Sequence, residues 1–283
     1  MHKQLFFRGS KTYYNAVRFF PPQIRKRVTF LYAFVRKLDN IVDTTQQDRE
    51  AFEMYCADYK DFYKKAVRGA VSWDDADPVL AGFVWLHLEC SFDPSWVEAF
   101  FYSMRLDLDK KNYNTLEETI EYMYGSAEVI GLFMAKIMNL PDAALSGARM
   151  LGRSMQYINF IRDINEDNTF GRRYIPLSDA PFKNLQEEET RKYPDDFEKF
   201  IRRELRRFLE WQEEANASFM YLPRRFRVAI GTASDMYLWT AEQLYLNPWQ
   251  VYRGSLKPSK SHIILRAIVN SFTGAALHRI RYT

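Results

Sequence analysis

The stretch QYINFIRDINED (156–167) carries two aspartates four residues apart in what otherwise has the composition of an apolar helix. RKLDNIVD (36–43) repeats the arrangement. Residues three or four apart share one face of a helix, so each pair of carboxylates projects to one side. The apolar residues around them leave no broad polar face of the kind that surface helices carry. Both segments are therefore predicted to be buried helices whose carboxylates face an interior cavity. The four carboxylates are Asp39, Asp43, Asp163 and Asp167.

The length and composition predict one large domain over residues 1–283. No linker rich in Gly, Ser or Pro divides the 283 residues, and hydrophobic residues make up 47% of them, enough for a sizeable core. Neither a signal peptide nor a run of about 18 apolar residues is present, which predicts a cytoplasmic protein. The net charge of +4 is small and the basic clusters alternate with acids and aromatics, so nucleic acid is not an expected partner.

Apolar residues at three- and four-residue spacing recur in long stretches without proline, and nothing comparable alternates like a strand. Prolines and the segment 169–181 separate these stretches, because proline restricts the residue before it and ends helices. The sequence therefore predicts an all-α fold in which the two aspartate-bearing helices can face each other across one cavity. The predicted helical stretches are 23–68, 95–109, 115–139, 143–168, 195–220 and 224–247.

The acidic residues belong to two polar stripes, each on one helix face. Buried carboxylates cost several kcal/mol each unless cations accompany them, so their convergence predicts a metal. Oxygen ligands without histidine or cysteine suit Mg²⁺, with Mn²⁺ as the alternative. A di-iron site is excluded, because no histidine follows a glutamate at the Glu-x-x-His spacing. The two stripes are Tyr32, Arg36, Asp39 and Asp43, and Gln156, Asn159, Asp163, Glu166 and Asp167.

Magnesium held by few carboxylates completes its shell with water and substrate phosphate, so a diphosphate ligand is implied. Arg36, Arg162 and Arg172 lie on or just beyond the same segments and could bind phosphate oxygens. The alternative is that these arginines only form ion pairs with the aspartates. The long segment 168–182 directly follows the second pair, and loops of this length beside a polar site are commonly lids or ligand-binding elements.

At this point the chain resembles the squalene/phytoene synthases, which join two prenyl diphosphates head to head. The most specific piece is QxxNxxRDxxED followed by GRxYxP. The matching segments are GSKTYYNAVRFFPP (9–22), LYAFVRKLDNIVD (31–43), SMRLDLDKKNYNT (103–115), EYMYGSAEVIGL (121–132), GRSMQYINFIRDINEDNTFGRRYIPL (152–177) and YRGSLKPSK (252–260).

The resemblance implies a helical bundle of the isoprenoid-synthase type around a central cavity, and it assigns roles to residues of this chain. The implied metal ligands are Asp39, Asp43, Asp163 and Asp167, with Glu166 in support. The implied diphosphate contacts are Arg36, Arg162, Arg172, Lys260 and an N-terminal set of Ser10, Lys11 and Thr12. The implied polar lining of the reaction chamber is Tyr32, Tyr124, Gln156, Asn159 and Tyr174, and Tyr124 and Arg36 join the four aspartates as implied catalytic residues.

The implied activity is a Mg²⁺-dependent condensation of two prenyl diphosphates through a cyclopropyl diphosphate. Phytoene from two geranylgeranyl diphosphates is the expected product. The alternatives are dehydrosqualene or, with NADPH, squalene from farnesyl diphosphate. A non-catalytic scaffold is a rival from another class, although all four aspartates are present. A head-to-tail chain elongator would be expected to carry two DDxxD motifs, which this chain lacks.

Three positions depart from the family pattern. Gly9 replaces a histidine or similar residue before Ser10, and Phe170 replaces an arginine that many members carry in the loop. Glu128 stands where the family has a small residue, and it is expected either to pair with an arginine or to turn outward at a kink. The C-terminal segment mixes apolar residues with arginines, which predicts peripheral contact at the inner membrane surface, with a helix packed on the bundle as the alternative.

Overall fold

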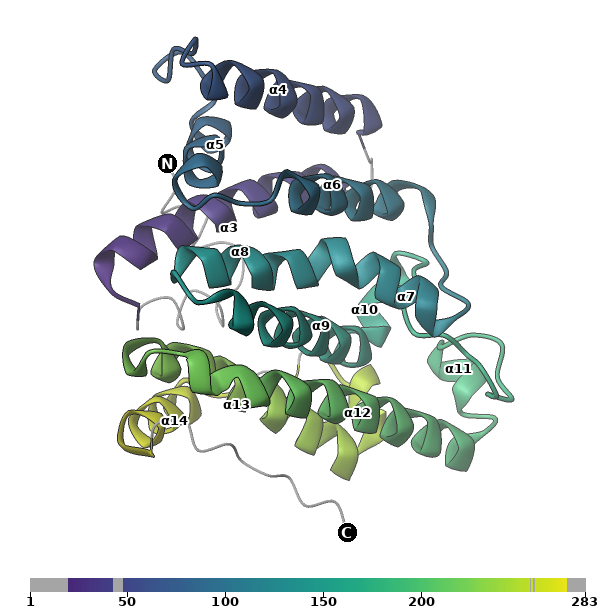
Figure 1. Ribbon diagram of the computed structural model, residues 1–283. Helices are drawn as coiled ribbons and strands as arrows, with labels where there is room; N and C mark the ends of the chain where they lie inside the picture. Colours follow the sequence, from purple (N-terminus) through teal and green to yellow (C-terminus); the bar gives the residue numbers. More distant parts are fainter. Residues whose placement is uncertain (1–19, 43–47, 255, 257, 274–283) are drawn as a thin grey trace.

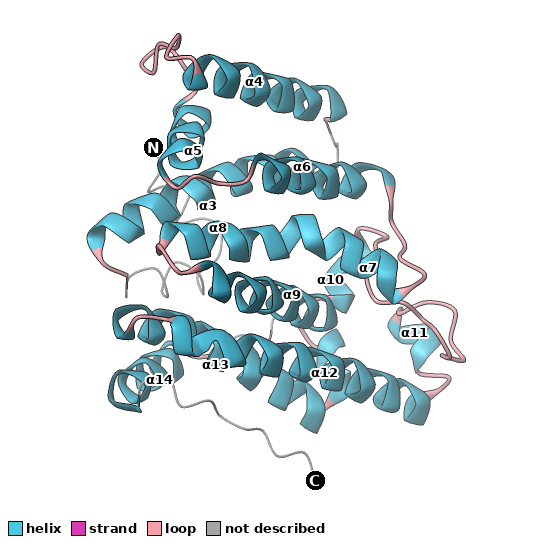
Figure 2. Cartoon of the chain, in the orientation of Figure 1, coloured by secondary structure: helices cyan, strands magenta, loops and turns pink. Residues whose placement is uncertain are grey.

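The computed structural model describes residues 20–42, 48–254, 256 and 258–273, without the side chains of 260, 264 and 271–273. These residues form helices and loops with no strand, and one isolated β-bridge joins Asn112 to Arg173 (Figure 2). The α-helices are α3 (Pro22–Val42), α4 (Arg49–Val67), α5 (Pro78–Glu89), α6 (Pro94–Asp109), α7 (Leu116–Met123), α8 (Val129–Ile137), α9 (Leu145–Arg162), α10 (Ile164–Thr169), α11 (Glu187–Thr190), α12 (Pro194–Ala217), α13 (Arg224–Leu246) and α14 (Lys260–Thr273). A π-helical turn, η1 (Tyr124–Glu128), and three 3₁₀ turns, η2 (Asp142–Ala144), η3 (Ser218–Tyr221) and η4 (Pro248–Tyr252), connect them.

The helices begin where the sequence offers caps. Asp77 and Asp93 each accept backbone N–H bonds at the start of α5 and α6, and each is followed by a proline at the first helical position. Proline needs no N–H there and its fixed φ suits the helix. Thr115 caps α7 by accepting from the Glu118 N–H. The predicted helix breaks before prolines are confirmed, because the same prolines start the next elements.

The helices stack in layers, with α4 at one end and α12, α13 and α14 at the other (Figure 1). The helices α3, α6, α8 and α9 lie between these ends. The helix α9 packs extensively against α12 on one side and against α8 and η1 on the other. The helix α9 therefore lies inside the bundle, whereas Asp163 at its C-terminal cap and Asp167 of α10 are half-buried, less than the sequence predicted.

The structure differs from the predicted stretches in several places. The stretch 23–68 is divided into α3 and α4, because Asp48 is not helical and caps α4. The stretch 115–139 is interrupted by η1, and 143–168 is interrupted at Asp163, where φ of −97° and ψ of 14° separate α9 from α10. The helix α5 was not predicted, because it is apolar nearly all round and so lacks a helical period. Its burial on most sides explains that composition.

Two groups of buried residues form the core. One group packs α3, α4, α5, α6 and α8 together. At its centre Phe34 stacks on Phe83 with a distance of 3.7 Å between the ring centroids. The other joins α9 to α12, α13 and the loop around Tyr174, which stacks on Phe160 at 4.3 Å. Residues of both groups reach the cavity described below, so the cavity lies where the two halves of the core meet.

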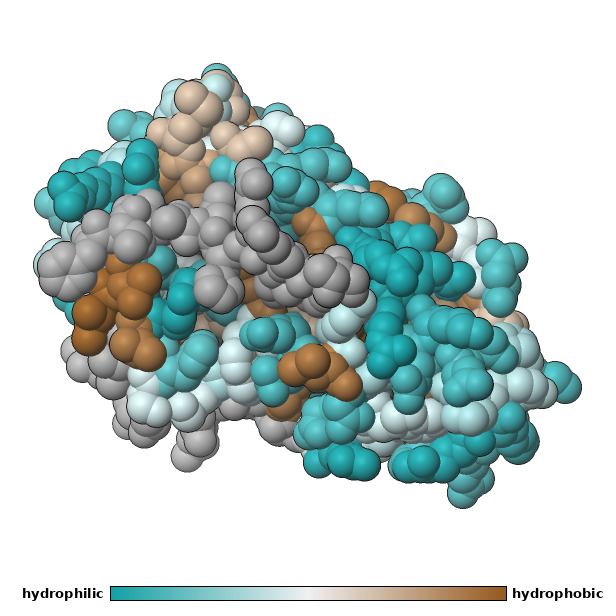
Figure 3. All heavy atoms as spheres, turned by 90° about the horizontal axis from the view of Figure 1, so that it is seen from below, coloured by the Kyte–Doolittle hydropathy of each residue, from teal (hydrophilic) through white to brown (hydrophobic). Residues whose placement is uncertain are grey.

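Within the described ranges, every helix is too short or too polar to cross a membrane. On the face shown in Figure 3, hydrophobic patches are separated by hydrophilic residues. The helix α14 packs on α13, and Leu265 and Ile268 on its outer side are 57% and 50% exposed. The C-terminal segment thus forms a helix packed on the bundle as far as residue 273, and membrane contact stays a prediction.

Candidate active site

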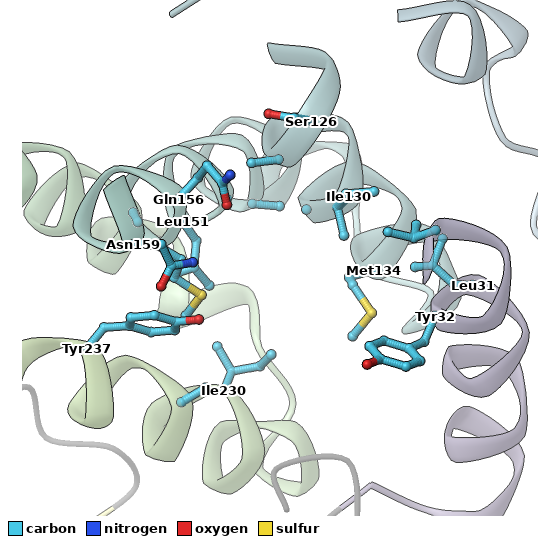
Figure 4. Close-up of a pocket in the computed structure, with 18 of the residues that line it drawn as sticks. Leu31, Tyr32, Ser126, Ile130, Met134, Leu151, Gln156, Asn159, Ile230 and Tyr237 are labelled. Carbon is cyan, nitrogen blue, oxygen red and sulfur yellow. The ribbon is translucent and has the colours of Figure 1, made fainter. Parts of the chain in front are cut away.

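A cavity of about 770 Å³ lies between α3 and α9. Figure 4 shows Leu31 and Tyr32 of α3 on one side of it, and Gln156 and Asn159 of α9 with Tyr237 of α13 on the other. The predicted arrangement of the two aspartate-bearing helices across one cavity is confirmed. The predicted site residues that line this cavity are Tyr32, Arg36, Asp39, Gln156, Asn159, Arg162, Asp163, Glu166, Asp167, Arg172 and Tyr174.

The cavity has a polar end and an apolar end. Along α9 the lining changes from Gly147 and Ala148 through Leu151 to Asn159 and Asp163. The lining residues of α3, α13 and the α7–α8 segment change in the same sense. With a rise of about 1.5 Å per residue, Gly147 and Asp163 are about 24 Å apart along α9. The cavity is therefore long, and its charged groups gather at one end.

Ion pairs hold the acids and arginines at the polar end. Arg162 donates Nε to Asp163 Oδ1 at 2.7 Å and Nη2 to Oδ2 at 2.5 Å. Arg36 Nη1 lies 3.9 Å from Asp39 Oδ2. These pairs match the alternative in which arginines neutralise the aspartates. They also show that the guanidinium groups already lie where an anionic ligand beside the carboxylates would meet them.

The acids suit a hard cation by their chemistry, since all their donor atoms are carboxylate oxygens. Asp39, Asp163, Glu166 and Asp167 line the same cavity. Among the described residues, however, no three acids, histidines or cysteines converge closely enough to hold an ion. Asp43, expected one turn after Asp39, lies outside the described residues. The donor set therefore fits a cation that completes its shell with water and substrate oxygens.

The loop after α10 is a fixed part of the wall. Arg173 donates to Tyr113 O at 2.7 Å and to Asn114 Oδ1 at 2.9 Å, and the β-bridge to Asn112 adds to this attachment. Beside it, Arg172 donates Nη2 to Val42 O at 3.2 Å, which links the loop to the end of α3. Of the two roles expected for this segment, a ligand-binding element agrees with these contacts. Phe170 is 43% exposed and also lines the cavity.

A buried carboxylate that sequence reasoning missed supports the polar end. Asp107 of α6 lines the cavity and accepts hydrogen bonds from the hydroxyls of Tyr122, at 2.8 Å, and Tyr174, at 2.9 Å. Burial and the nearby Asp107 charge hold the pKa of both tyrosines well above the usual value, so both hydroxyls stay protonated and donate. The sequence signal that could have identified Asp107 is its spacing, because it lies on the same helix face as the buried Phe100 and Met104.

Asn159 lines the cavity one helical turn before Asp163. Its side chain hydrogen-bonds the Tyr237 hydroxyl, and its Oδ1 is buried without a partner in the described part of the chain. Burial raises the pKa of Tyr237, so that hydroxyl also stays protonated. The hydrogen bond to Tyr237 fixes the Asn159 side chain in the cavity wall.

The expectation that Tyr124 lines the reaction chamber is wrong. Tyr122, Ser126 and Ile130 line the cavity at four-residue spacing, whereas Tyr124 lies two residues out of phase and points to the opposite side. There it borders a smaller outer pocket with Glu128 and other residues. Tyr122 is the tyrosine of this segment that faces the cavity.

Several expected contacts cannot be placed. Ser10, Lys11 and Thr12 lie outside the described residues, as do Gly9 and Asp43. Lys260 begins α14, but its side chain is outside the described part. Their roles stay predictions.

Comparison with known proteins places the chain in a family. The family model described as squalene/phytoene synthase matches residues 7–262. The 15-cis-phytoene synthase of Pantoea ananas is 27% identical over 277 residues, covering 94% of this chain and 89% of the relative. The 15-cis-phytoene synthase of Enterobacter agglomerans is 28% identical over 274 residues, covering 92% and 91%.

Solved structures share the fold. A dehydrosqualene synthase in complex with ligand superposes with a TM-score of 0.76 at 21% identity, covering 97% of this chain and 95% of that one. A squalene synthase from Alicyclobacillus acidocaldarius gives a TM-score of 0.74 at 22% identity, covering 89% and 93%. The all-α prediction is confirmed. With a cavity that joins clustered acids and arginines to a long apolar wall, the chain belongs to the squalene/phytoene synthase family of head-to-head prenyltransferases.

Proposed function

We propose that this protein condenses two geranylgeranyl diphosphates head to head into phytoene, with Mg²⁺ bound between its aspartates and the substrate diphosphates. The observation that carries the proposal is the single long cavity with charged groups at one end. The cited relatives named phytoene synthases, which cover nearly the whole chain, support the same product.

The length of the cavity supports a long substrate. With carbon–carbon bonds of about 1.5 Å, the main chain of a geranylgeranyl group extends to about 20 Å. The distance of about 24 Å between Gly147 and Asp163 along α9 leaves room for this chain with its diphosphate at the polar end. A farnesyl group, one isoprene unit shorter, would leave the innermost part of the cavity unfilled.

Each polar residue has a defined task in this proposal. Arg36, Arg162 and Arg172 bind diphosphate oxygens, because guanidinium groups match phosphate geometry. Asp39, Asp163 and Asp167, together with Asp43, would hold the metal. When bound, the metal supplies positive charge that stabilises the departing diphosphate. The buried Asp107 fixes the two tyrosine hydroxyls beside this end.

The apolar lining protects the cationic chain from water. Departure of the first diphosphate leaves an allylic cation, which the double bond of the second substrate attacks, and loss of a proton closes a cyclopropane. Departure of the second diphosphate starts a rearrangement of that ring, and loss of a further proton gives phytoene. Met134 and Ile130 line the cavity and exclude water from the cationic chain.

Product analysis tests the proposal. The protein is incubated with Mg²⁺ and either geranylgeranyl or farnesyl diphosphate, each with and without NADPH, and products are identified by chromatography and mass spectrometry. A forty-carbon hydrocarbon formed without NADPH is expected. A thirty-carbon product would instead assign dehydrosqualene or, if NADPH is required, squalene synthesis, in line with the structural neighbours. No product from either substrate would support the scaffold alternative.

Peripheral membrane contact remains a proposal for the C-terminal segment. The hydrocarbon product dissolves in membranes, and the exposed Leu265 and Ile268 lie on α14. Flotation with anionic liposomes tests it by comparing the full-length protein with a variant carrying Leu265→Ser and Ile268→Ser. Flotation of the full-length protein alone is expected, and failure of both to float contradicts the proposal.

A further inference from the structure

The fully buried carboxylate of Glu128 lies on the side of η1 that faces away from the cavity, with 0% of the residue exposed. Arg153 Nε donates to its Oε1 at 2.7 Å. Arg149 donates Nε and Nη2 to its Oε2, at 3.0 Å and 2.9 Å. Both arginines belong to α9, so one acid ties the π-helical turn to that helix. The expected arginine partner and the expected outward turn of Glu128 are both present.

On their other side, the segments of η1 and α9 that carry these ion pairs form part of the cavity wall. Gly152 lies between the two arginines on α9 and lines the cavity with Ala127 of η1. A Cβ atom added at Gly152 would lie 2.4 Å from Ala127 O, a distance that real Cβ atoms do not show. The backbones of α9 and η1 therefore touch, and the Glu128 ion pairs hold them together from outside.

The wide turn itself depends on its neighbours. The Val129 N–H donates to Tyr124 O, five residues earlier. Such π-helical bonds are rare in proteins overall but frequent at functional sites. Gly125 packs so closely on α6 that an added Cβ would lie 2.0 Å from Ala99 O. The turn is thus confined by α6 on one side and by Glu128 and its arginines on the other.

We propose that Glu128, Arg149 and Arg153 form a clamp that positions the wall of the reaction cavity. Gln156 and Asn159 follow Gly152 by one and two helical turns on the cavity face of α9, so the clamp sets how they lie relative to Ser126 and Ala127. Glu128 is a positioning residue, because it lies outside the cavity and acts through α9. This inference rests on the proposed function.

The clamp governs the fate of the cationic intermediates rather than the binding of diphosphate. Of the diphosphate-binding residues, Arg36 lies on α3 and Arg172 on the loop after α10, while Arg162 ends α9 nine residues beyond Arg153, so none belongs to the clamp. Loss of the clamp lets η1 and α9 separate and widens the middle of the cavity. Small displacements of groups around a reacting centre cost much in rate, so turnover is expected to fall while substrate affinity persists.

Glu128→Gln tests the clamp, with Glu204→Gln as a matched control. Glu204 is 1% exposed and also lies between two arginines, Arg203 at 2.8 Å and Arg207, but it packs against α9 from the side of α12. In Glu128→Gln we expect kcat to fall between about tenfold and hundredfold, with KM within about threefold of wild type. The cyclopropyl diphosphate is expected to appear as a released product. Glu204→Gln is expected to lose similar thermal stability without this release.

Equal release from both variants, or none from Glu128→Gln, overturns the clamp. Arg149→Lys keeps the charge but loses the paired hydrogen bonds, so it is expected to give a smaller change of the same kind even if Glu128→Gln folds poorly. Hydrogen exchange gives a readout that needs no turnover: faster exchange at 122–131, which Glu204 does not contact, is expected in Glu128→Gln and not in Glu204→Gln. Wild-type protein that makes no product would reject the proposed function, while this exchange pattern would still decide whether the clamp exists.

Discussion

The two ends of the cavity are built in different ways. At the polar end, charged side chains have fixed partners, such as Arg162 on Asp163 and the two tyrosine hydroxyls on Asp107. At the apolar end, methionines and small residues make up much of the wall. Methionine fills irregular spaces and adapts to different shapes. The polar end should therefore control the rate of reaction and the apolar end the length of the substrate. The apolar wall includes Met134, Met138, Ala144, Ala148, Ala229 and Ala233.

The largest effect is expected from the carboxylates of the polar end. Asp39→Ala should lower kcat at least about hundredfold, because groups that stabilise developing charge in a dry site contribute about that much each. Steady-state assays with the productive prenyl diphosphate measure it. Asn40→Ala, at the exposed neighbouring position, is the control and should keep wild-type activity. A loss below tenfold for Asp39→Ala would break the assignment of rate control to this end.

A smaller loss of activity is expected on substitution of Asp107, whose carboxylate holds two tyrosine hydroxyls at the polar end. Asp107→Asn removes the charge that accepts two tyrosine hydroxyls, and hydrogen bonds to charged groups contribute about 1.5–3 kcal/mol. We expect kcat to fall about tenfold and the melting temperature to drop by several degrees. Asp109→Asn, an exposed position on the same helix, should change neither quantity appreciably. Unchanged turnover in Asp107→Asn would restrict that carboxylate to a structural role.

At the apolar end, substitution should change selectivity more than rate. Ala148→Phe fills the inner part of the cavity, so we expect the ratio of kcat/KM for geranylgeranyl over farnesyl diphosphate to fall about tenfold. Competition between the two substrates measures this ratio. Ala143→Phe places the same ring at an exposed position nearby and should leave the ratio unchanged. An equal loss with both substrates would show that this end also controls the rate.

The smallest effect on activity belongs to a buried histidine outside the cavity. Burial lowers the pKa of His87 to about 4, below the value of about 6.5 in an unfolded chain. Between these values the unfolded chain binds a proton that the folded protein does not. Stability is therefore complete above pH 6.5 and is lost as the pH falls toward 4, by at most about 1.4 kcal/mol per pH unit.

Denaturant unfolding at pH 7 and at pH 4.5 checks this dependence. His87→Phe should lose less stability than wild type between the two values, because it removes the titrating group. Activity at pH 7 should stay near wild type, because His87 contacts Tyr59 and Tyr63 within the core and not the cavity. An identical pH dependence in both proteins would contradict the assignment to His87.

The polar end could be predicted because its residues leave a local signature. Asp163 follows Asn159 by one helical turn, and this spacing alone places both on one face of a helix. Tyr124 was placed wrongly because its face depends on η1, and a π-helical turn has no reliable sequence pattern. Most residues of the apolar end carry no such signature, since methionine and alanine at helical spacing look the same in a solid core and in a cavity wall.

The sequence by itself determined an all-α chain, aspartates paired at helical spacing in two segments, and the family to which they belong. These features depend on residues close together along the chain, where helical geometry relates spacing to direction. Only the tertiary structure decided that α3 and α9 face each other, that Asp107 joins them from α6, and that Glu128 turns away toward Arg149 and Arg153. These pairings link residues 15 or more positions apart, so packing of the whole chain and the cost of burying an unpaired charge selected them.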